Sequence, residues 1–366
     1  MTQVRRSTPR EPRTPSAKGP QDGAPSSFSD GYDPRVRYLI TGGSGYIGSR
    51  LVERLSERDD TERIVITDIR PPASFRPKTA FERLDVRDAD RARELIAAER
   101  PDVVIHLAFV LNPIHDQEVE YDIDVGGTQN VLRAASEAGV EHVMVTTSAT
   151  AYGAFPDNPV PITEDWPVRG VPSFPYACHK TEADRLCQLW ALEHPDRTMT
   201  IVRPCIVFGP NVNNYIVRLW TEQPFQAEFG LPPQPLQFVH EDDLVDALER
   251  LLHGRHGGAF NVAGDGTITP PECADLIGMK RRRVPLGLYW KLGSLMWALR
   301  QSETPPGNLH FVMHPWVVAT GRLKEATGWS PEHTSRETFE ITMRARGKLP
   351  PQPASAKPEL ASPVGA

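Results

Sequence analysis

Short apolar runs alternate with amphipathic stretches through the first half of the chain. The apolar runs predict strands over 36–40, 63–67, 103–107 and 142–147. The stretches with helical periodicity predict helices over 47–56, 91–99 and 128–138. Strands that alternate with helices indicate βαβ units, whose strands run parallel in one sheet. The pattern therefore predicts an α/β fold with a Rossmann-like, doubly wound parallel sheet.

The second half of the chain is less regular. Helical stretches near 180–193, 242–253 and 286–299 are separated by loops rich in Pro and Gly. We expect a sheet domain over 36–204 and a smaller C-terminal lobe formed mainly by 205–348, with the chain crossing between the two. Residues 1–35 and 349–366 are rich in Pro and poor in apolar residues. Such segments bury too little apolar area to fold, so we expect two disordered tails.

Composition excludes several classes of protein. The 366 residues carry a formal net charge of -6, which argues against a nucleic-acid-binding protein. The four cysteines form no C-x-x-C pair, which fits a reducing compartment. No segment approaches the roughly 20 consecutive apolar residues of a membrane span, and no secretory signal is recognisable. We expect a cytoplasmic protein without an integral membrane segment.

A glycine-rich turn joins the first predicted strand to the first predicted helix. Gly42 permits the tight turn, Gly45 lets the backbone approach a pyrophosphate, and Gly48 lets the helix pack closely on the sheet. Asp68 ends the next strand at the distance that suits a carboxylate on the ribose hydroxyls. The motif predicts dinucleotide binding. The carboxylate favours NAD over NADP because it repels a 2′-phosphate, and Arg70 is the one opposing signal.

Candidate catalytic residues follow farther along the chain. Tyr176 and Lys180 are four residues apart, so a helix places them on one face. A nearby ammonium is expected to lower the pKa of the phenol, which makes Tyr176 a usable acid and base for interconverting an alcohol and a ketone. The same lysine can hold the ribose of the cofactor. Ser148 follows the strand over 142–147, and its hydroxyl can hydrogen-bond the reacting oxygen.

With these motifs, the chain from about Arg37 to about Trp329 resembles the extended short-chain dehydrogenase/reductases, the NAD-dependent epimerase/dehydratase group. The resemblance rests on the glycine turn, Asp68, the three catalytic candidates and several short segments: Asp85-Val86, His106-Leu107-Ala108, 125–128, 148–153, Arg203-Pro204, Gly209-Pro210, and 238–240 with Asp243. It implies NAD as the cofactor and a homodimer formed by helices near 114–137 and 178–193.

The resemblance also implies contacts with NAD along the whole cofactor. At the glycine turn and the adenosine ribose the implied residues are Gly42, Gly45, Tyr46, Ile47, Gly48, Asp68 and Arg70. At the adenine they are Asp85 and Val86. At the nicotinamide, its ribose and the loop that covers it they are Leu107, Ala108, Phe109, Asp124, Tyr176, Lys180 and Pro204. Two positions depart from the family pattern. Asp124 stands where the family usually has Asn, and Phe109 stands where it usually has Ala.

The expected function is hydride transfer between C4 of the nicotinamide and a carbinol carbon, with Tyr176 as acid and base. The motifs leave open whether the hydride returns to the same substrate, as in an epimerase, or the oxidised product leaves, as in a dehydrogenase. A dehydrogenase or reductase of an apolar, lipid-like or steroid-like alcohol is one alternative. A non-catalytic NAD-binding sensor is another, although the intact Ser148, Tyr176 and Lys180 argue against it.

The substrate is less well defined than the cofactor. Ser148 is followed by Ala149-Thr150, where the family's dehydratases carry an Asp-Glu pair, so we do not expect a 4,6-dehydratase. Members that bind UDP-sugars usually have an Arg two positions before the aromatic that matches Phe238, and here Leu236 stands there. Ile206 also replaces a frequent Asn. UDP-hexose is therefore a doubtful substrate, and a nucleotide sugar would have to use Arg218 or Arg322 for its phosphates.

Three further segments have competing interpretations. His106 is expected to be a packed residue at a strand end, and His240 with its three following acids a helix start, so no metal site is predicted. The basic run 280–283 precedes an apolar stretch over 284–299. One interpretation of these two segments is a buried helix preceded by a solvated basic run. The other is an exposed helix that either lies at a membrane surface or forms a lid over an apolar substrate.

Overall fold

The computed structural model describes residues 35–303 and 305–351. The predicted tails fall almost entirely outside these ranges. Seven parallel strands form the main sheet in the order β10-β6-β5-β4-β1-β2-β3. Their bounds are Val36–Thr41 for β1, Thr61–Asp68 for β2, Thr79–Arg83 for β3, Val103–His106 for β4, His142–Thr146 for β5, Thr198–Pro204 for β6 and Gly258–Val262 for β10. The predicted Rossmann-like parallel sheet is therefore confirmed.

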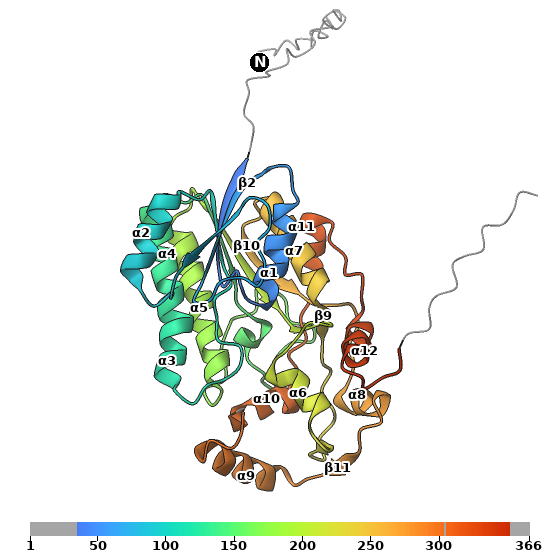
Figure 1. The fold of residues 1–366 in the computed structure, drawn as a ribbon. Coiled ribbons are helices and arrows are strands. Elements are labelled where there is room, and N and C mark those ends of the chain that lie inside the picture. The colour runs from blue at the N-terminus through green and yellow to red at the C-terminus, as the bar shows by residue number, and fades with distance from the viewer. Residues whose placement is uncertain (1–34, 304, 352–366) are drawn as a thin grey trace, which may run out of the picture. The chain divides into compact units, whose positions relative to one another are not determined.

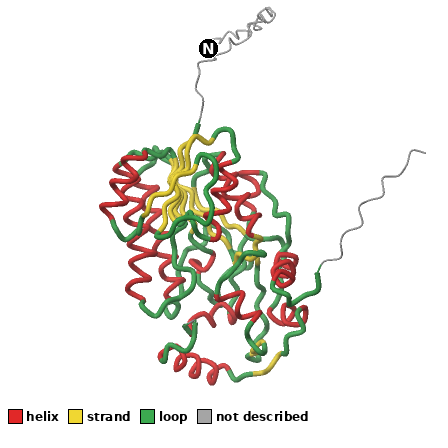
Figure 2. Tube along the Cα trace, viewed as in Figure 1, coloured by secondary structure: helices red, strands yellow, loops and turns green. Residues whose placement is uncertain are grey.

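Helices cover both faces of the sheet (Figures 1 and 2). One face carries α2 (Ala89–Glu99), α4 (Gly127–Glu137) and α5 (Pro175–Glu193), and the other carries α1 (Tyr46–Ser56) and α7 (Glu241–His253). Successive side chains of β1 point to opposite faces, as strand geometry requires. Ile40 packs into the same core as Leu51 of α1, and Leu39 packs into the other core with Val131 of α4.

The hydrophobic pattern predicted β1, β2, β4 and β5 with the helices α1, α2 and α4, but not β3, β6 and β10. The edge strand β3 is only partly buried, so its residues show no clear alternation. Polar residues interrupt β6 and β10, although both strands lie inside the protein. Arg203 and Asn261 are buried at 2% and 0% exposure. Their burial depends on partners far away in the sequence, which a local pattern does not reveal.

Most of the remaining elements lie beyond the carboxyl edge of the sheet. They comprise two small parallel pairs, β7 (Ile206–Phe208) with β9 (Phe238–His240) and β8 (Gln226–Glu228) with β11 (Arg281–Arg283). The helices of this part are α6 (Tyr215–Thr221), α8 (Pro270–Leu276), α9 (Leu286–Ala298), α10 (His310–Met313) and α12 (Ser335–Ala345), whereas α11 (Gly321–Thr327) packs beside β10 and α7. Both α7 and β10 come after residue 204 yet belong to the layers of the main sheet.

A buried ion pair joins α5 to the sheet. Arg203 of β6 donates two hydrogen bonds to the carboxylate of Asp184, of 2.8 Å from Nε and 2.7 Å from Nη2. The remaining guanidinium nitrogen donates to the hydroxyl of Tyr152 at 2.8 Å and to the carbonyl of Glu164 at 3.1 Å. Asp184 also accepts a hydrogen bond of 2.9 Å from the hydroxyl of Thr147, directly after β5. The pair of Arg203 and Asp184 therefore fixes the segments that contain Thr147, Tyr152 and Glu164.

Replacing Asp184 by Asn should destabilise the protein strongly. The substitution leaves the buried guanidinium of Arg203 without its counter-ion, and breaking a buried pair in this way costs about 3–5 kcal/mol. Urea denaturation gives the free energy of unfolding. The control is Glu141→Gln, which removes the carboxylate from an exposed pair with Arg255 and should cost less than about 1 kcal/mol. Equal losses in the two variants would contradict this role for the pair.

Candidate active site

The glycine turn packs against the segment that follows β4. Gly42 has a φ of +70°, and a Cβ there would lie 2.7 Å from the backbone nitrogen of Ala108. A Cβ on Gly48 would meet the carbonyl oxygen of Gly42. Only glycine fits both constraints without displacing backbone. The helix α1 begins at Tyr46, and no described side chain caps its N-terminus at Gly45. Its first backbone N–H groups therefore remain available to an anion.

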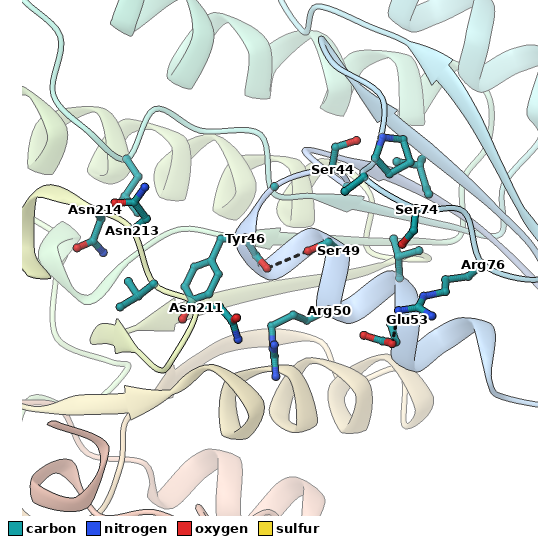
Figure 3. A pocket seen from close by; sticks show the side chains of 18 residues that line it. Ser44, Tyr46, Ser49, Arg50, Glu53, Ser74, Arg76, Asn211, Asn213 and Asn214 are labelled. Carbon is teal, nitrogen blue, oxygen red and sulfur yellow. Dashed lines mark hydrogen bonds and ion pairs between the residues drawn. The ribbon is translucent and has the colours of Figure 1, made fainter. Parts of the chain in front are cut away.

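Asp68 lies beside this turn, as its spacing predicted. Its carboxylate accepts hydrogen bonds of 3.3 Å from the backbone nitrogens of both Ser44 and Arg70. A cavity of about 470 Å³ opens along the same turn (Figure 3). Its lining comes from the turn, from the outer side of α1, from 72–76 and from 211–214. Gly45 and Tyr46 contribute to the lining, whereas Ser148, Tyr176 and Lys180 lie outside it.

The two residues expected at the adenine take different positions. Asp85 is at the surface, where its carboxylate pairs with Arg87 at 2.6 Å, and this contact lowers its pKa. Val86 is buried and packs on α4, because a Cβ on Gly127 would come within 2.5 Å of its side chain. Leu107, Ala108 and Phe109 follow β4 and are all partly exposed, and Pro204 ends β6 as a buried residue.

Ser148, Tyr176 and Lys180 come together at the carboxyl end of β5. Tyr176 and Lys180 lie in the first turns of α5, which begins with Pro175. Ser148 caps a short 3-10 helix, and its hydroxyl accepts a hydrogen bond of 3.1 Å from the backbone nitrogen of Thr150. Ser148 and Tyr176 are also hydrogen-bonded to each other, which favours the phenolate. The structure thus assembles the three catalytic candidates that the sequence indicated.

The electrostatics of Tyr176 differ from the expectation that an ammonium lowers its pKa. Burial raises the pKa of Tyr176, the carboxylate of Asp124 raises it further, and the hydrogen bond with Ser148 only partly offsets both. The ammonium of Lys180 is directed elsewhere. Its Nζ lies 3.1 Å from the centroid of the Phe109 ring and donates a hydrogen bond of 3.1 Å to the carbonyl of Thr146. Burial lowers the pKa of Lys180 to about 7.

Asp124 belongs to a buried group that the sequence did not bring together. It lies in a π-helical turn, η1 (Asp122–Gly126), which joins α3 (Gln117–Tyr121) to α4. One carboxylate oxygen accepts a hydrogen bond of 2.7 Å from the backbone nitrogen of Val110. The other lies 3.7 Å from Nδ1 of His179 on α5, and Glu120 approaches the same nitrogen at 3.7 Å. The departure from the usual Asn at position 124 was the one available signal.

The two histidine predictions agree with the structure. His106 is fully buried, with its ring nitrogens 2.6 Å from the hydroxyl of Thr41 and 3.1 Å from that of Thr128, and burial lowers its pKa to about 3. His106 is therefore a packed residue at a strand end. His240 caps the N-terminus of α7 by accepting a hydrogen bond of 3.3 Å from the backbone nitrogen of Asp242.

The prediction of a buried helix over 284–299 is wrong. No residue of α9 is buried, and the leucines at positions 288, 292, 295 and 299 are all more than half exposed. The basic strand β11 before it is exposed, as the solvated entry predicted. Trp297 stacks on His115 with ring centroids 3.9 Å apart, so α9 contacts the loop between β4 and α3. Within 35–303 and 305–351, none of the helices has the length and apolar content that crossing a bilayer requires.

Known proteins with similar sequences or folds agree with this architecture. Residues 38–263 match the model of the NAD dependent epimerase/dehydratase family. The UDP-glucose 4-epimerase of Mycolicibacterium smegmatis is 31% identical over 328 residues, covering 84% of this chain and 97% of that protein. An uncharacterized protein of Mycobacterium tuberculosis is 26% identical, covering 87% of this chain and 85% of its own length.

Two solved structures illustrate the shared fold. The Thermus thermophilus UDP-glucose 4-epimerase in complex with NAD has a TM-score of 0.66 at 22% identity and covers 85% of this chain and 99% of its own. The Bacillus anthracis dTDP-glucose 4,6-dehydratase, also in complex with NAD, has a TM-score of 0.65 at 18% identity, covering 86% and 97%. Since both enzyme classes share this architecture, the fold does not separate their reactions.

The burial of Lys180 should make stability depend on pH. The folded protein releases the Lys180 proton near pH 7, whereas the unfolded chain holds it up to about pH 10.5. Between these values the unfolded state binds more protons, so the free energy of unfolding should rise with pH relative to Lys180→Met, by at most about 1.4 kcal/mol per pH unit. Urea denaturation from pH 7 to 10 measures this difference.

Lys291→Met is the matched control, because Lys291 is exposed on α9. We expect this variant to keep the pH profile of the wild type. A difference between wild type and Lys180→Met that stays constant over the same pH range would contradict the buried, neutral amine.

Proposed function

This chain belongs to the NAD-dependent epimerase/dehydratase family, and we propose that it transfers a hydride between NAD and a carbinol carbon of a small-molecule substrate. The observation that carries this proposal is the group formed by Ser148, Tyr176 and Lys180. It lies at the carboxyl end of β5, where doubly wound sheets bind their ligands. The hydroxyl of Ser148 acts on Tyr176 there by lowering its pKa, and in this proposal both hydroxyls face the same reacting oxygen.

The residues around the glycine turn fit a dinucleotide. A Cβ on Gly42 would meet the segment after β4, and the uncapped N-terminus of α1 faces the space that a pyrophosphate needs. Asp68 lies next to the turn at Ser44, in reach of ribose hydroxyls. Its negative charge favours NAD over NADP. When bound, the nicotinamide supplies the hydride acceptor or donor, and the chain itself supplies the positions and the protons.

Tyr176 is the proposed acid and base. Because burial raises its pKa, the phenol holds its proton at neutral pH and can donate it to a forming alkoxide. In the direction of alcohol oxidation, Tyr176 must first lose this proton. In this proposal Ser148 donates a second hydrogen bond to the reacting oxygen, and Lys180 would hold the nicotinamide ribose. Whether the hydride returns to the substrate decides between epimerase and dehydrogenase.

An alcohol less polar than a nucleotide sugar is a second candidate substrate, and α9 favours it. Arg218 and Arg322 are the proposed diphosphate ligands, but Arg218 pairs with Glu303 at 2.8 Å and Arg322 pairs with Asp165 at 2.6 Å. Trp297 of α9 contacts His115 in the loop that begins after β4 and carries Phe109, and the exposed leucines lie on the same helix. A substrate with apolar carbon would find a complementary surface there.

The proposed homodimer rests on family resemblance and on one structural feature. Leu189 and Leu192 of α5 are 55% and 78% exposed, and Tyr121 at the end of α3 is 40% exposed. Apolar side chains on neighbouring helices suit a contact between two copies of the chain. Light scattering that gives a monomer mass at micromolar concentration would contradict it.

Tyr176→Phe should lower turnover by about 10²–10⁴-fold, because it removes only the oxygen that transfers the proton. Its affinity for NADH, measured by fluorescence titration, should stay near that of the wild type. The comparison variant is Lys180→Ala, for which we expect weaker NADH binding as well as slower turnover. Unchanged turnover in Tyr176→Phe would refute the site. Binding of NAD without turnover of any alcohol or sugar would favour the non-catalytic sensor.

Titration of the wild type with NADPH should give weaker binding than titration with NADH, because the carboxylate of Asp68 repels a 2′-phosphate.

UDP and UDP-glucose should not bind with micromolar affinity to the NAD-loaded protein. The reason is that Leu236 and Ile206 lack polar groups for a diphosphate, and the two candidate arginines, Arg218 and Arg322, are paired with carboxylates. Isothermal titration calorimetry measures this, with the Mycolicibacterium smegmatis UDP-glucose 4-epimerase as the positive control. Micromolar binding of UDP would instead establish a nucleotide sugar as the substrate.

A further inference from the structure

Three titratable side chains converge in the buried space between α3, η1 and α5. Glu120 comes from the end of α3, Asp124 from η1 and His179 from the second turn of α5. Their exposures are 1%, 0% and 7%. One atom of each, Oε1 of Glu120, Oδ2 of Asp124 and Nδ1 of His179, lies within 4.8 Å of the other two. The cluster is therefore compact and almost fully buried.

The three facing atoms have no hydrogen-bond partner among the described residues. The other oxygen of each carboxylate is held in place. Glu120 accepts a hydrogen bond of 3.2 Å from the backbone nitrogen of Ile114, and Asp124 accepts one of 2.7 Å from that of Val110. Each carboxylate is thus oriented by one oxygen and presents the other to the cluster. Buried charges without such a partner are strongly unfavourable, so the group needs a positive charge, either a proton or a metal cation.

A proton on His179 does not meet this need. Nδ1 can carry a single hydrogen, and it lies 3.7 Å from both carboxylate oxygens. This separation exceeds the 2.7–3.2 Å of an N–H···O hydrogen bond. A metal ion bound at about 2.1 Å by N and O ligands instead places those ligands roughly 3.4 Å apart in tetrahedral geometry. The two distances of 3.7 Å from Nδ1 of His179 exceed this separation by about 0.3 Å.

We propose that Glu120, Asp124 and His179 bind one divalent transition-metal ion through these three atoms. One imidazole and two carboxylates suit Zn²⁺ or Mn²⁺, because the nitrogen ligand disfavours Mg²⁺ and Ca²⁺. The π-helical turn contributes by carrying Asp124 within reach of His179, and such turns are frequent at functional sites. The sequence predicted no metal site. The reason is that the spacing of Glu120, Asp124 and His179 along the chain matches no metal-binding motif.

A cavity of about 400 Å³ borders the cluster on its outer side, and His179, Tyr121 and Asp122 contribute to its lining. Of the three proposed ligands His179 alone lines this cavity, so an ion would approach the cluster from the side of this imidazole. The cavity also lies on helices that the proposed dimer would use, so a dimer contact would cover it. Ion content is therefore measured both on protein expressed in metal-supplemented medium and on protein reloaded after chelation.

The second group of possible ligands, Asp243, Glu332 and His333, carries no such proposal. Asp243 accepts hydrogen bonds of 2.9 and 3.2 Å from the backbone nitrogens of Glu332 and His333. Its carboxylate is therefore satisfied by a structural role in holding the chain after α11.

The ion would also change the surroundings of Tyr176. The carboxylates of Asp124 and Glu120 both raise the pKa of this phenol. A dication held between them would offset that negative charge beside the proposed acid and base. The metal site nevertheless stands apart from the proposed function, because it rests on the geometry of the cluster and its test measures binding of the ion itself.

The test is metal analysis of the full-length protein by inductively coupled plasma mass spectrometry, after growth with Zn²⁺ or Mn²⁺. We expect about one ion per chain in the wild type. Chelated protein should regain the ion on titration, with its melting temperature rising by roughly 2–4 °C. Reloading with Co²⁺ should give visible d–d absorption typical of nitrogen and oxygen ligands.

Glu120→Gln and His179→Gln each replace one ligand by a neutral group, and both should bind the ion at least about tenfold more weakly. The matched control is Glu118→Gln, which removes an exposed carboxylate of α3 that borders the same cavity. It should bind like the wild type. Equal binding by the wild type and both ligand variants would overturn the proposal. So would a wild type that holds less than about 0.1 ion per chain and gains none on titration, a result that stands even if the variants fail to fold.

Discussion

The buried pair of Arg203 and Asp184 fixes the geometry on which the candidate site depends. Asp184 lies one turn of α5 after Lys180, and it also holds Thr147, the residue before Ser148. The same arginine reaches Tyr152, which ends the short helix that Ser148 begins. The strand end and the helix that carry the three candidate residues are therefore clamped to one guanidinium. Such a fully satisfied network rigidifies its surroundings, which is what a proton-transfer site requires.

Burial, more than pairing, decides the charges of the site. Lys180 sits under the ring of Phe109 and against a backbone carbonyl, so its ammonium stabilises its immediate neighbours instead of the phenol of Tyr176. The ring of Phe109 covers the amine at 3.1 Å from its centroid. Asp124 adds negative charge on the other side of Tyr176. Both departures from the family pattern thus act on the same pair of residues.

Local spacing was enough to predict the parts of the fold that are local. The glycine turn, Asp68 at the end of the next strand, and the pairing of Tyr176 with Lys180 along one helix all follow from distances along the chain. The roles of Asp184, Glu120 and His179 could not be predicted in this way, because the side chains that each of them contacts lie on other elements. The strands β6 and β10 were not predicted for the same reason. Their polar residues look unsuited to a buried strand until Asp184 and Tyr152 supply the partners.

The position of β10 also constrains how the protein is made. The strand that covers the edge of β6 consists of residues Gly258–Val262, and α7, which covers one face beside it, directly precedes this strand. During synthesis, the sheet is therefore left with an open, largely apolar edge until more than fifty further residues have left the ribosome. Unpaired strand edges of this kind invite association with other chains. The nascent protein thus keeps this edge of β6 open for longer than a sheet whose last two strands are close together in the sequence.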